Sequence, residues 1–308
     1  MLDPRPDAPV ALLTTSAAAH LDVDLPLLVD ALAALELTPA VVDWHDAEHD
    51  WAGHELVVVR STWDYTDHLD EFLAVLSTIA GATVLANPLA AVSANVDKRY
   101  LTRLAARGVP VVPTAVVEPG EGFEVPAGAF VVKPVVSAGA RDTERYDREE
   151  LGAARAHVDA LHAAGRAALV QPYVTAVDDH GETGLVYLAD ELSHGFRKGP
   201  LLQPGVSVVE GLYREEQITP RRPTDAERAV AEAALDAVAA VDPTTRRSDL
   251  LYARVDLVPG PDGPILMELE LVEPSLFLDM GDGAPARAAA AIDRHLAGIR
   301  GSGRRRHG

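Results

Sequence analysis

Short apolar runs alternate with longer amphipathic segments over the first 88 residues of the chain. The short runs are typical of buried strands, whereas the longer segments repeat their apolar positions with the period of a helix. Asp22 or Asp24 is placed to cap the first helix. The predicted strands are residues 9–16, 40–44, 55–61 and 83–87, and the predicted helices are residues 22–37 and 67–81. Continuous apolar strands between helices indicate a parallel sheet covered on both faces, and hence an α/β domain.

The remainder of the chain mixes helices with hairpins. A Thr224/Glu227 capping box opens one helix, and the turn sequence PGPDGP at 259–264 separates two strands. The basic, glycine-rich residues 301–308 are predicted to be a disordered tail. The predicted helices are residues 93–108, 148–165, 224–241 and 284–299, and the predicted strands and hairpins are 130–136, 167–174, 181–200 and 250–277. A chain of 308 residues is long enough for more than one domain.

Composition and charge exclude several classes of protein. The chain has no cysteine, which excludes disulfides, thiolate chemistry and cysteine-ligated zinc. Its formal net charge of −20 argues against nucleic-acid or anionic-membrane binding, because both need a basic surface. No apolar run approaches the length that spans a bilayer, and the first residues lack the basic and apolar regions of a signal peptide. We therefore expect a cytoplasmic protein that binds neither nucleic acid nor membranes.

Three carboxylates and one guanidinium are predicted to share one patch of the hairpin at 250–277. Side chains alternate between the two faces of a strand, so Arg254 and Asp256 share a face, as do Glu268 and Glu270. A turn at PGPDGP places Asp256 near Glu268 and Arg254 near Glu270. Like charges opposite one another destabilise a sheet, and a hard divalent cation such as Mg²⁺ would neutralise the excess. The alternative is the solvated face of an amphipathic hairpin.

Lysine is rare in this chain, because 27 residues are lysine or arginine and only Lys98, Lys133 and Lys198 are lysines. Lys133 lies inside the apolar run FVVKPVV, which is predicted to be a buried strand, where an ammonium group needs an anionic partner. Phosphate would serve, because lysine binds it as a compact charge and Mg²⁺ bridges its oxygens. Lysines opposite a carboxylate-held metal therefore describe a nucleoside triphosphate site. The alternative for each lysine is a surface position with its head in water.

The order of these residues along the chain resembles the ATP-grasp superfamily. The likeness covers roughly residues 90–278, with an α/β domain in front. It implies an N-terminal parallel-sheet domain at 1–88, followed by a two-subdomain α+β ATP-grasp fold with subdomains at 89–170 and 171–300. ATP-grasp relatives are often dimers, which leaves a homodimer open.

The resemblance also implies roles for individual residues. Residues 137–140 (SAGA) resemble a short form of the mobile loop over the phosphates, and QPYV (171–174) resembles the hinge that holds adenine. The implied ribose ligand is Glu182 or Asp178. Many members carry asparagine where this chain has Glu270, which leaves open whether one or two Mg²⁺ ions bind. The implied ATP contacts are Lys98, Lys133, Gln171, Tyr173, Val174, Glu182 and Lys198, the implied Mg²⁺ ligands are Asp256, Glu268 and Glu270, and the implied catalytic cations are Arg254 and Lys133.

The segment VVVRSTWDYTDHL (57–69) leaves the first domain at the carboxyl end of a strand, where open α/β sheets bind ligands. Arg60 could pair with a substrate carboxylate, and the residues after it could contact the rest of the molecule. The alternative is that Asp64 or Thr66 caps the next helix while Trp63 packs beside it. The predicted substrate contacts are Arg60, Ser61, Thr62, Trp63, Asp64 and Ser137.

Five segments are similar to one branch of the ATP-grasp superfamily, which includes the cyclo-ligase that closes O-ureido-D-serine in D-cycloserine biosynthesis. They are RSTWDY, NVDKRYL, KPVVSAGA, ADELSHGFRK and ELELVEPSLF. The resemblance implies that ATP phosphorylates the carboxylate of a small amino-acid-like substrate and that a nitrogen nucleophile attacks the product, intramolecular cyclisation included. The phosphoryl step needs positioning and charge neutralisation, and we expect no obligatory base.

Three alternatives accompany this interpretation. A bimolecular amino-acid or peptide ligase uses the same activation chemistry, so the sequence does not separate it from a cyclase. A non-catalytic ATP-binding regulatory protein could dispense with metal ligands, and the presence of Asp256, Glu268 and Glu270 therefore argues for an enzyme. HDAEH (45–49) matches the H-x-x-E-H pattern of zinc peptidases. It lies in a short connection between predicted strands and not on a helix, which argues against a zinc site.

Overall fold

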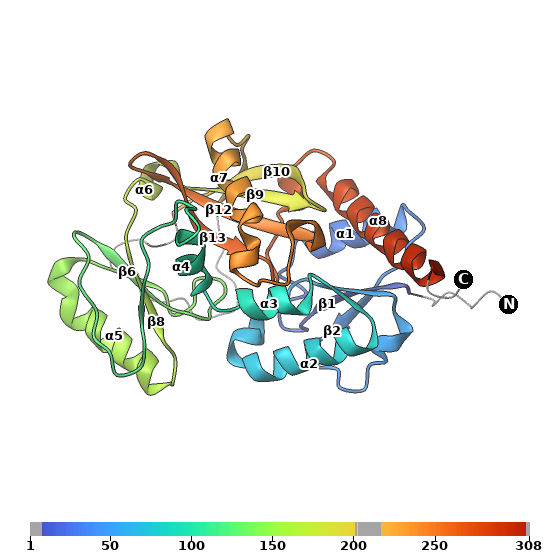
Figure 1. Ribbon diagram of the computed structural model, residues 1–308, viewed down its shortest axis with the longest axis horizontal. Helices are drawn as coiled ribbons and strands as arrows, with labels where there is room; N and C mark the ends of the chain where they lie inside the picture. The colour runs from blue at the N-terminus through green and yellow to red at the C-terminus, as the bar shows by residue number, and fades with distance from the viewer. Residues whose placement is uncertain (1–7, 201, 203–216, 306–308) are drawn as a thin grey trace.

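Three β-sheets follow one another along the chain (Figure 1). The structure is a computed structural model that describes residues 8–200, 202 and 217–305. In this part of the chain, a four-stranded sheet of β1–β4 precedes a four-stranded sheet of β5–β8 and a five-stranded sheet of β9–β13. None of the described helices is long and apolar enough to cross a membrane. The predicted order, an α/β domain followed by two α+β units, is confirmed.

The first sheet is parallel, as predicted, with strand order β2-β1-β3-β4. Leu12 shares a core with the leucines of α1 on one face, and Leu13 shares a core with α2 on the other, because successive side chains alternate. Asp22 caps α1 by accepting the backbone N–H groups of Asp24 and Leu25 at 2.9 and 3.2 Å. The elements are β1 (Val10–Thr14), α1 (Asp24–Ala33), β2 (Ala40–Asp43), β3 (Leu56–Val59), α2 (Leu69–Ala82) and β4 (Val84–Ala86).

The predicted helix at 93–108 is two helices in the structure, α3 (Leu89–Asn95) and α4 (Tyr100–Ala105), so the prediction of one continuous helix is wrong. The backbone N–H of Lys98 donates to Val135 O at 2.8 Å instead of closing a helical turn. Just before the break, the Asn95 amide bonds the backbone of Leu269 and Leu271, at 2.9 Å each. Lys98 therefore lies between two helices, in a segment that hydrogen-bonds to both of the later sheets.

The second sheet is antiparallel, with order β5-β8-β6-β7, and α5 packs on it. Lys133 lies in β6, as predicted, and is only 6% exposed. Strand β8 crosses the predicted boundary between residues 170 and 171, so that boundary falls inside a strand. The elements are β5 (Ala115–Val117), β6 (Phe130–Pro134), β7 (Glu144–Tyr146), α5 (Leu151–Ala163) and β8 (Ala168–Pro172).

The third sheet is also antiparallel, with order β11-β10-β9-β12-β13. Helix α7 begins with the predicted Thr224/Glu227 capping box and packs against this sheet together with α4. The predicted hairpins at 181–200 and 250–277 are confirmed. The elements are α6 (Val177–His180), β9 (Glu182–Leu188), β10 (Glu191–Lys198), β11 (Ile218–Pro220), α7 (Asp225–Asp236), β12 (Tyr252–Gly260) and β13 (Gly263–Glu270).

The last helix, α8 (Ala284–Arg305), returns to the first domain and packs beside α1 (Figure 1). Its Ile292 and Leu296 share a core with Leu12 of β1. The C-terminal end of the predicted subdomain 171–300 therefore contributes to the core of the first sheet. The predicted disordered tail is wrong for residues 301–305, which continue α8, and residues 306–308 lie outside the described residues.

The first domain also holds the loop that follows β13. The buried Asp24 carboxylate accepts the N–H groups of residues 276–278 at 2.6, 3.0 and 2.6 Å. Arg60 Nη2 lies 3.8 Å from Asp24 Oδ2 and donates to Pro274 O at 2.9 Å. Side chains of the first domain therefore fix the backbone that continues from the predicted metal-binding strand.

Replacing Asp24 with alanine is expected to lower the free energy of unfolding by about 3–5 kcal/mol, because three buried N–H groups and the Arg60 guanidinium lose their anionic partner. Urea unfolding measures this difference. The matched control, Asp30→Ala, changes an exposed aspartate on the same helix and is expected to stay within about 0.5 kcal/mol of the wild type. Equal unfolding midpoints for the two variants would contradict the assignment.

Candidate active site

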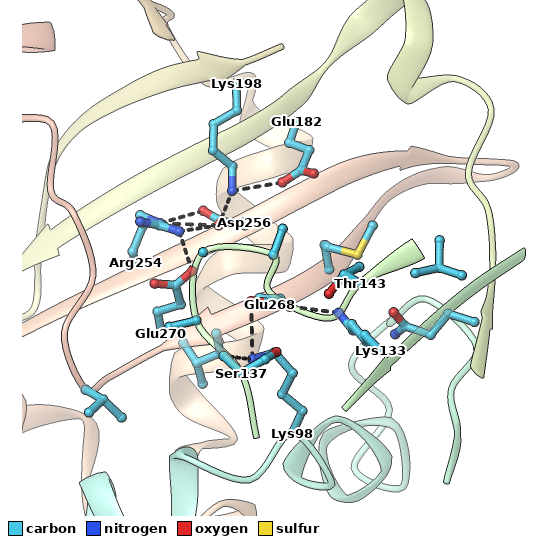
Figure 2. A pocket seen from close by; sticks show the side chains of 18 of the residues that line it. Lys98, Lys133, Ser137, Thr143, Glu182, Lys198, Arg254, Asp256, Glu268 and Glu270 are labelled. Carbon is cyan, nitrogen blue, oxygen red and sulfur yellow. Dashed lines mark hydrogen bonds and ion pairs between the residues drawn. The ribbon is translucent and has the colours of Figure 1, made fainter. Parts of the chain in front are cut away.

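One pocket is lined by side chains from the first domain and from both later sheets. Trp63 comes from the first domain, Lys133 from β6 and Asp256 from β12. Figure 2 shows lysine and carboxylate side chains of this pocket pointing toward one another. The predicted site residues that line the pocket are Trp63, Lys98, Lys133, Ser137, Gln171, Tyr173, Val174, Glu182, Lys198, Arg254, Asp256, Glu268 and Glu270.

The hairpin of β12 and β13 has the predicted register. Arg254 lies opposite Glu270, and Asp256 lies opposite Glu268. The pairing register shifts between Asp256 and Leu257. The regular alternation of side chains between the two faces therefore ends at Asp256, on the side of the hairpin toward the turn. The resulting patch of three carboxylates and one guanidinium faces the pocket, and the alternative of a solvated hairpin face is therefore wrong.

Glu268 pairs with lysines that come from outside its own sheet (Figure 2). Lys133 Nζ lies 2.8 Å from Glu268 Oε1, and Lys98 Nζ lies 4.0 Å from Glu268 Oε2. Lys98 Nζ also donates to Ser137 O at 2.7 Å. Burial alone would raise the pKa of Glu268, but Lys133 and Lys98 outweigh burial and hold this pKa well below its ordinary value. The anionic partner that the sequence required for Lys133 is therefore Glu268 in this structure.

Asp256 is the most enclosed carboxylate of the patch, with 1% of its surface exposed. Lys198 Nζ lies 2.8 Å from its Oδ2 and 3.0 Å from Glu182 Oε2. Arg254 donates Nε to Asp256 Oδ1 at 3.0 Å and Nη2 to Oδ2 at 2.9 Å. Burial would raise the pKa of Asp256, but Arg254 and Lys198 hold it below its ordinary value. Asp256 is therefore an anion with two cationic partners.

Of the three carboxyls in the patch, Glu270 is the one that the surrounding cations neutralise least. Enclosure in the pocket raises the pKa of Glu270 to about 7; its partner Arg254 opposes the rise, and the charges of Asp256 and Glu268 add to it. Near neutral pH Glu270 is therefore partly protonated, and a bound cation would displace this proton.

These donors fit a Mg²⁺ ion that enters together with phosphate. Among the residues that the structure describes, no three acidic or histidine side chains converge into a ready-made metal cage. Mg²⁺ usually binds proteins through one or two carboxylates and takes its remaining ligands from phosphate oxygens and water, so such a cage is not required. Glu268 and Glu270, two residues apart on β13, would supply the hard oxygen donors, and Asp256 lies opposite Glu268.

The predicted nucleotide hinge also lines the pocket, over residues 171–174. Of the two predicted ribose ligands, Glu182 lines the pocket, where it pairs with Lys198. Asp178 does not line it, and its carboxylate accepts the Tyr173 hydroxyl at 2.5 Å. The geometry therefore favours Glu182 as the acidic group beside the hinge.

The loop after β6 contributes backbone and small side chains to the pocket. Gly139, Ala140 and Asp142 have φ values of 60°, 57° and 51°, a left-handed conformation that glycine adopts most readily. Arg141 pairs with Asp67 of the first domain, at 2.7 Å from Nη1 to Oδ2 and 3.0 Å from Nη2 to Oδ1. The loop that resembles the phosphate-covering loop is therefore tied to the first domain across the pocket.

Four predicted substrate contacts, Arg60, Ser61, Thr62 and Asp64, do not line the pocket. Arg60 is 2% exposed, and its guanidinium bonds the backbone of the loop after β13 beside Asp24. The prediction that Arg60 pairs with a substrate carboxylate is therefore corrected, because this cation supports the pocket wall from behind. Ser61 and Thr62 are similarly buried, at 1% and 0% exposure.

Asp64 belongs to a polar cluster at the end of the first sheet. It accepts a hydrogen bond from Trp44 Nε1 at 2.8 Å, and its Oδ2 lies 2.9 Å from His45 Nε2. His45 begins the HDAEH motif, whose second histidine, His49, lies 2.8 Å from His54 Nε2 through its own Nε2. The motif is not helical, as its place between two strands predicts.

The wall from the first domain consists of Trp63 and Tyr65, in the short helix η2 (Trp63–Asp67). Neither Asp64 nor Thr66 caps α2, which begins without a side-chain cap, so the capping alternative is wrong. Tyr65 and Glu273 are among the pocket residues that sequence reasoning missed. Glu273 lies beyond the end of β13, where strand alternation no longer indicates which way a side chain points.

Solved structures with little sequence identity to this chain share its arrangement of sheets. A RimK domain ATP-grasp protein from Sphaerobacter thermophilus has a TM-score of 0.62 at 20% identity, over 92% of this chain and 98% of that chain. A D-alanine–D-alanine ligase from Bacillus anthracis has a TM-score of 0.65 at 13% identity, over 95% and 98% of the two chains. At these identities the likeness shows the fold alone, which is the ATP-grasp fold.

Nearer matches agree in sequence as well as in fold. The cycloserine biosynthesis protein DcsG of Streptomyces lavendulae is 38% identical over 301 residues, which cover 93% of this chain and 98% of that protein. The crystal structure of D-cycloserine synthetase DcsG has a TM-score of 0.84 at 37% identity, over 93% of this chain and 99% of that chain. Residues 10–87 match the family of DcsG N-terminal domains. The chain therefore belongs to the DcsG family of ATP-grasp ligases, and the predictions of an enzyme and of this branch are confirmed.

Glu270→Gln is expected to stabilise the ligand-free protein at pH 8. A carboxyl whose pKa rises from 4.5 to about 7 on folding favours its neutral form, so its ionisation costs stability as pH rises from about 4.5, and the cost is complete above about 7. The glutamine variant avoids this cost, which is on the order of 1–3 kcal/mol, and its melting temperature should be a few degrees higher at pH 8. Near pH 5 the difference should nearly vanish.

Thermal unfolding followed by circular dichroism at both pH values measures this effect. The control Glu191→Gln removes an exposed carboxylate at the start of β10 and is expected to leave the melting temperature unchanged at either pH. A Glu270→Gln variant that melts below the wild type at pH 8 would refute the electrostatic argument.

Proposed function

We propose that this enzyme uses ATP and Mg²⁺ to phosphorylate the carboxylate of a small amino-acid-like molecule, whose own nitrogen then attacks the acyl phosphate and closes a ring. The observation that carries the proposal is the pocket patch, in which Lys133 and Arg254 face three carboxylates. The 38% identity to a cycloserine biosynthesis protein supports the cyclising branch. O-ureidoserine is therefore the substrate to test first.

The charges in the pocket match the needs of this chemistry. A carboxylate is a poor acyl donor because its oxygen will not leave, and phosphorylation turns that oxygen into a leaving group. The phosphoryl step depends on positioning and on neutralising negative charge. Lys98 and Lys133 would neutralise phosphate oxygens, and Arg254 would stabilise the reacting acyl oxygens. Glu268 and Glu270, with Asp256 nearby, would hold a Mg²⁺ ion, which would neutralise negative charge on the phosphate groups.

The ion pairs of the structure support an exchange of partners on binding. Lys133 and Glu268 neutralise each other at 2.8 Å. Phosphate oxygens can replace Glu268 as the partner of Lys133, and Glu268 then becomes available to the metal. Because each group exchanges one partner for another, neither charge is left buried and unpaired, which would cost several kcal/mol.

Hydroxylamine trapping tests the activation step without knowledge of the natural nucleophile. Purified protein with Mg²⁺, ATP, hydroxylamine and a panel of amino and hydroxy acids, including both enantiomers of O-ureidoserine, is expected to form a hydroxamate and an equal amount of ADP for one acid. Omitting hydroxylamine should give a cyclic product from that acid. Absence of both hydroxamate and ADP across the panel would favour a non-catalytic ATP-binding protein.

Lys133→Met is expected to lower ATP turnover by at least about 100-fold, because it removes a buried charge that stabilises the transferring phosphoryl group. Parallel ADP assays and circular dichroism separate lost catalysis from lost folding. Arg155→Met, which removes an exposed cation from α5 beside the same sheet, is the matched control and should retain wild-type turnover. A folded Lys133→Met variant with wild-type turnover would disprove the role of Lys133.

A further inference from the structure

Glu273 lies on the side of the pocket that the first domain builds. It follows Glu270 by three residues and lines the pocket together with Trp63 and Tyr65. Trp63 Nε1 donates to the backbone oxygen of Glu273 at 3.2 Å, and the Tyr65 hydroxyl hydrogen-bonds with the Glu273 carboxyl. Trp63 and Tyr65 are 7% and 3% exposed, so they hold Glu273 against a rigid wall.

Glu273 differs from the other carboxylates of the pocket. The described pocket residues include five carboxylates, and four of them lie within 4.0 Å of a lysine or arginine nitrogen. Among the described residues no such ion pair holds the fifth, Glu273. The proposed metal would engage Glu268 and Glu270, whereas Glu273 lies outside that set of ligands.

The surroundings of Glu273 suit the uptake of a proton near neutral pH. Burial raises the pKa of Glu273 to about 8; the charge of Glu270 adds to the rise, whereas Lys98 and the Tyr65 hydroxyl oppose it. Burial and the nearby glutamates also raise the pKa of Tyr65 well above its ordinary value, so its hydroxyl stays protonated and can donate to the carboxylate. A base is most effective when its pKa lies near the working pH.

The proposed reaction needs a proton acceptor in its second step. When the nitrogen attacks the acyl carbon, a C–N bond forms, the bond from that carbon to the phosphate oxygen breaks, and inorganic phosphate leaves with the electron pair. The nitrogen must then lose one proton. Asp256 and Glu268 are poor acceptors, because their cationic partners hold the pKa of each below its ordinary value.

We propose that Glu273 accepts this proton on a carboxylate oxygen while Tyr65 holds the carboxylate in place. Glu273 then releases the proton to water after the products leave, and the charge of the site returns to its starting value. The inference rests on the proposed function and adds to it a general base for the attack of nitrogen, whereas the sequence alone led us to expect no obligatory base.

Comparing two products of one enzyme isolates this step. O-ureido-D-serine, ATP and Mg²⁺ are supplied with and without concentrated hydroxylamine, which reacts with the acyl phosphate and brings a base in solution. In Glu273→Gln the ratio of cyclic product to hydroxamate is expected to fall by at least about 100-fold relative to the wild type, because proton transfer by a side chain contributes about 10²–10⁴-fold. Glu273→Asp, which keeps a carboxylate, should recover part of the loss.

The pH profile supplies a readout that a purely structural role would not move. Cyclisation by the wild type should slow as the pH falls, because Glu273 becomes protonated, and this acidic limb of the pH profile should be absent from Glu273→Gln. Tyr65→Phe should shift the limb to higher pH, because it removes a hydrogen bond that favours the carboxylate.

Each outcome decides the proposal. An unchanged product ratio in a folded Glu273→Gln variant, or an acidic limb that persists in it, would overturn the role of Glu273 while leaving the proposed function intact. An equal loss of hydroxamate and cyclic product would also overturn it, because Glu273 would then serve activation or binding. If the wild type itself forms neither product from O-ureido-D-serine, the proposed cyclisation fails and the role of Glu273 fails with it.

Discussion

The Lys133–Glu268 ion pair is the interaction on which the architecture of the site depends. Lys133 belongs to β6 of the second sheet and Glu268 to β13 of the third, and their charged atoms lie 2.8 Å apart across the pocket. Either charge alone would be costly to bury, so the pair favours the closed juxtaposition of the two sheets. Lys198 and Asp256 repeat the arrangement within the third sheet. The buried lysines of the pocket are therefore each paired with a carboxylate from another strand.

The first domain shapes the pocket, whereas the lysines that line it come from later in the chain. Its buried Asp24 and Arg60 fix the loop after β13, its Trp63 and Tyr65 wall one side of the pocket, and its Asp67 holds the loop after β6 through Arg141. All of these contacts join segments that are distant in sequence. A substrate bound against this wall would therefore be positioned by the same domain that holds both pocket loops in place.

Positions that follow the regular alternation of side chains along a strand could be predicted from the sequence. The direction in which a side chain points once the strand has ended could not, because it depends on how the sheets pack. Strand alternation and one turn sufficed to place Arg254 opposite Glu270, and a lone lysine in an apolar strand required a buried anionic partner. Arg60 follows a strand end, where sequence does not tell whether a side chain enters the pocket or supports it from behind. The partner of Lys133 and the role of Glu273 likewise depend on how the sheets pack, because Glu273 meets Tyr65 only in the folded chain.

The coupling between metal and nucleotide tests the exchange of ion-pair partners most directly. Calorimetric titrations would compare Mg²⁺ alone, ATP without metal, and ATP in the presence of Mg²⁺. Because Lys133 and Lys198 already neutralise the carboxylates, Mg²⁺ alone should bind weakly, and its presence should tighten ATP binding by at least about 10-fold. Micromolar binding of Mg²⁺ to the nucleotide-free protein, with no effect of Mg²⁺ on ATP affinity, would contradict an exchange of partners between the lysines and the carboxylates.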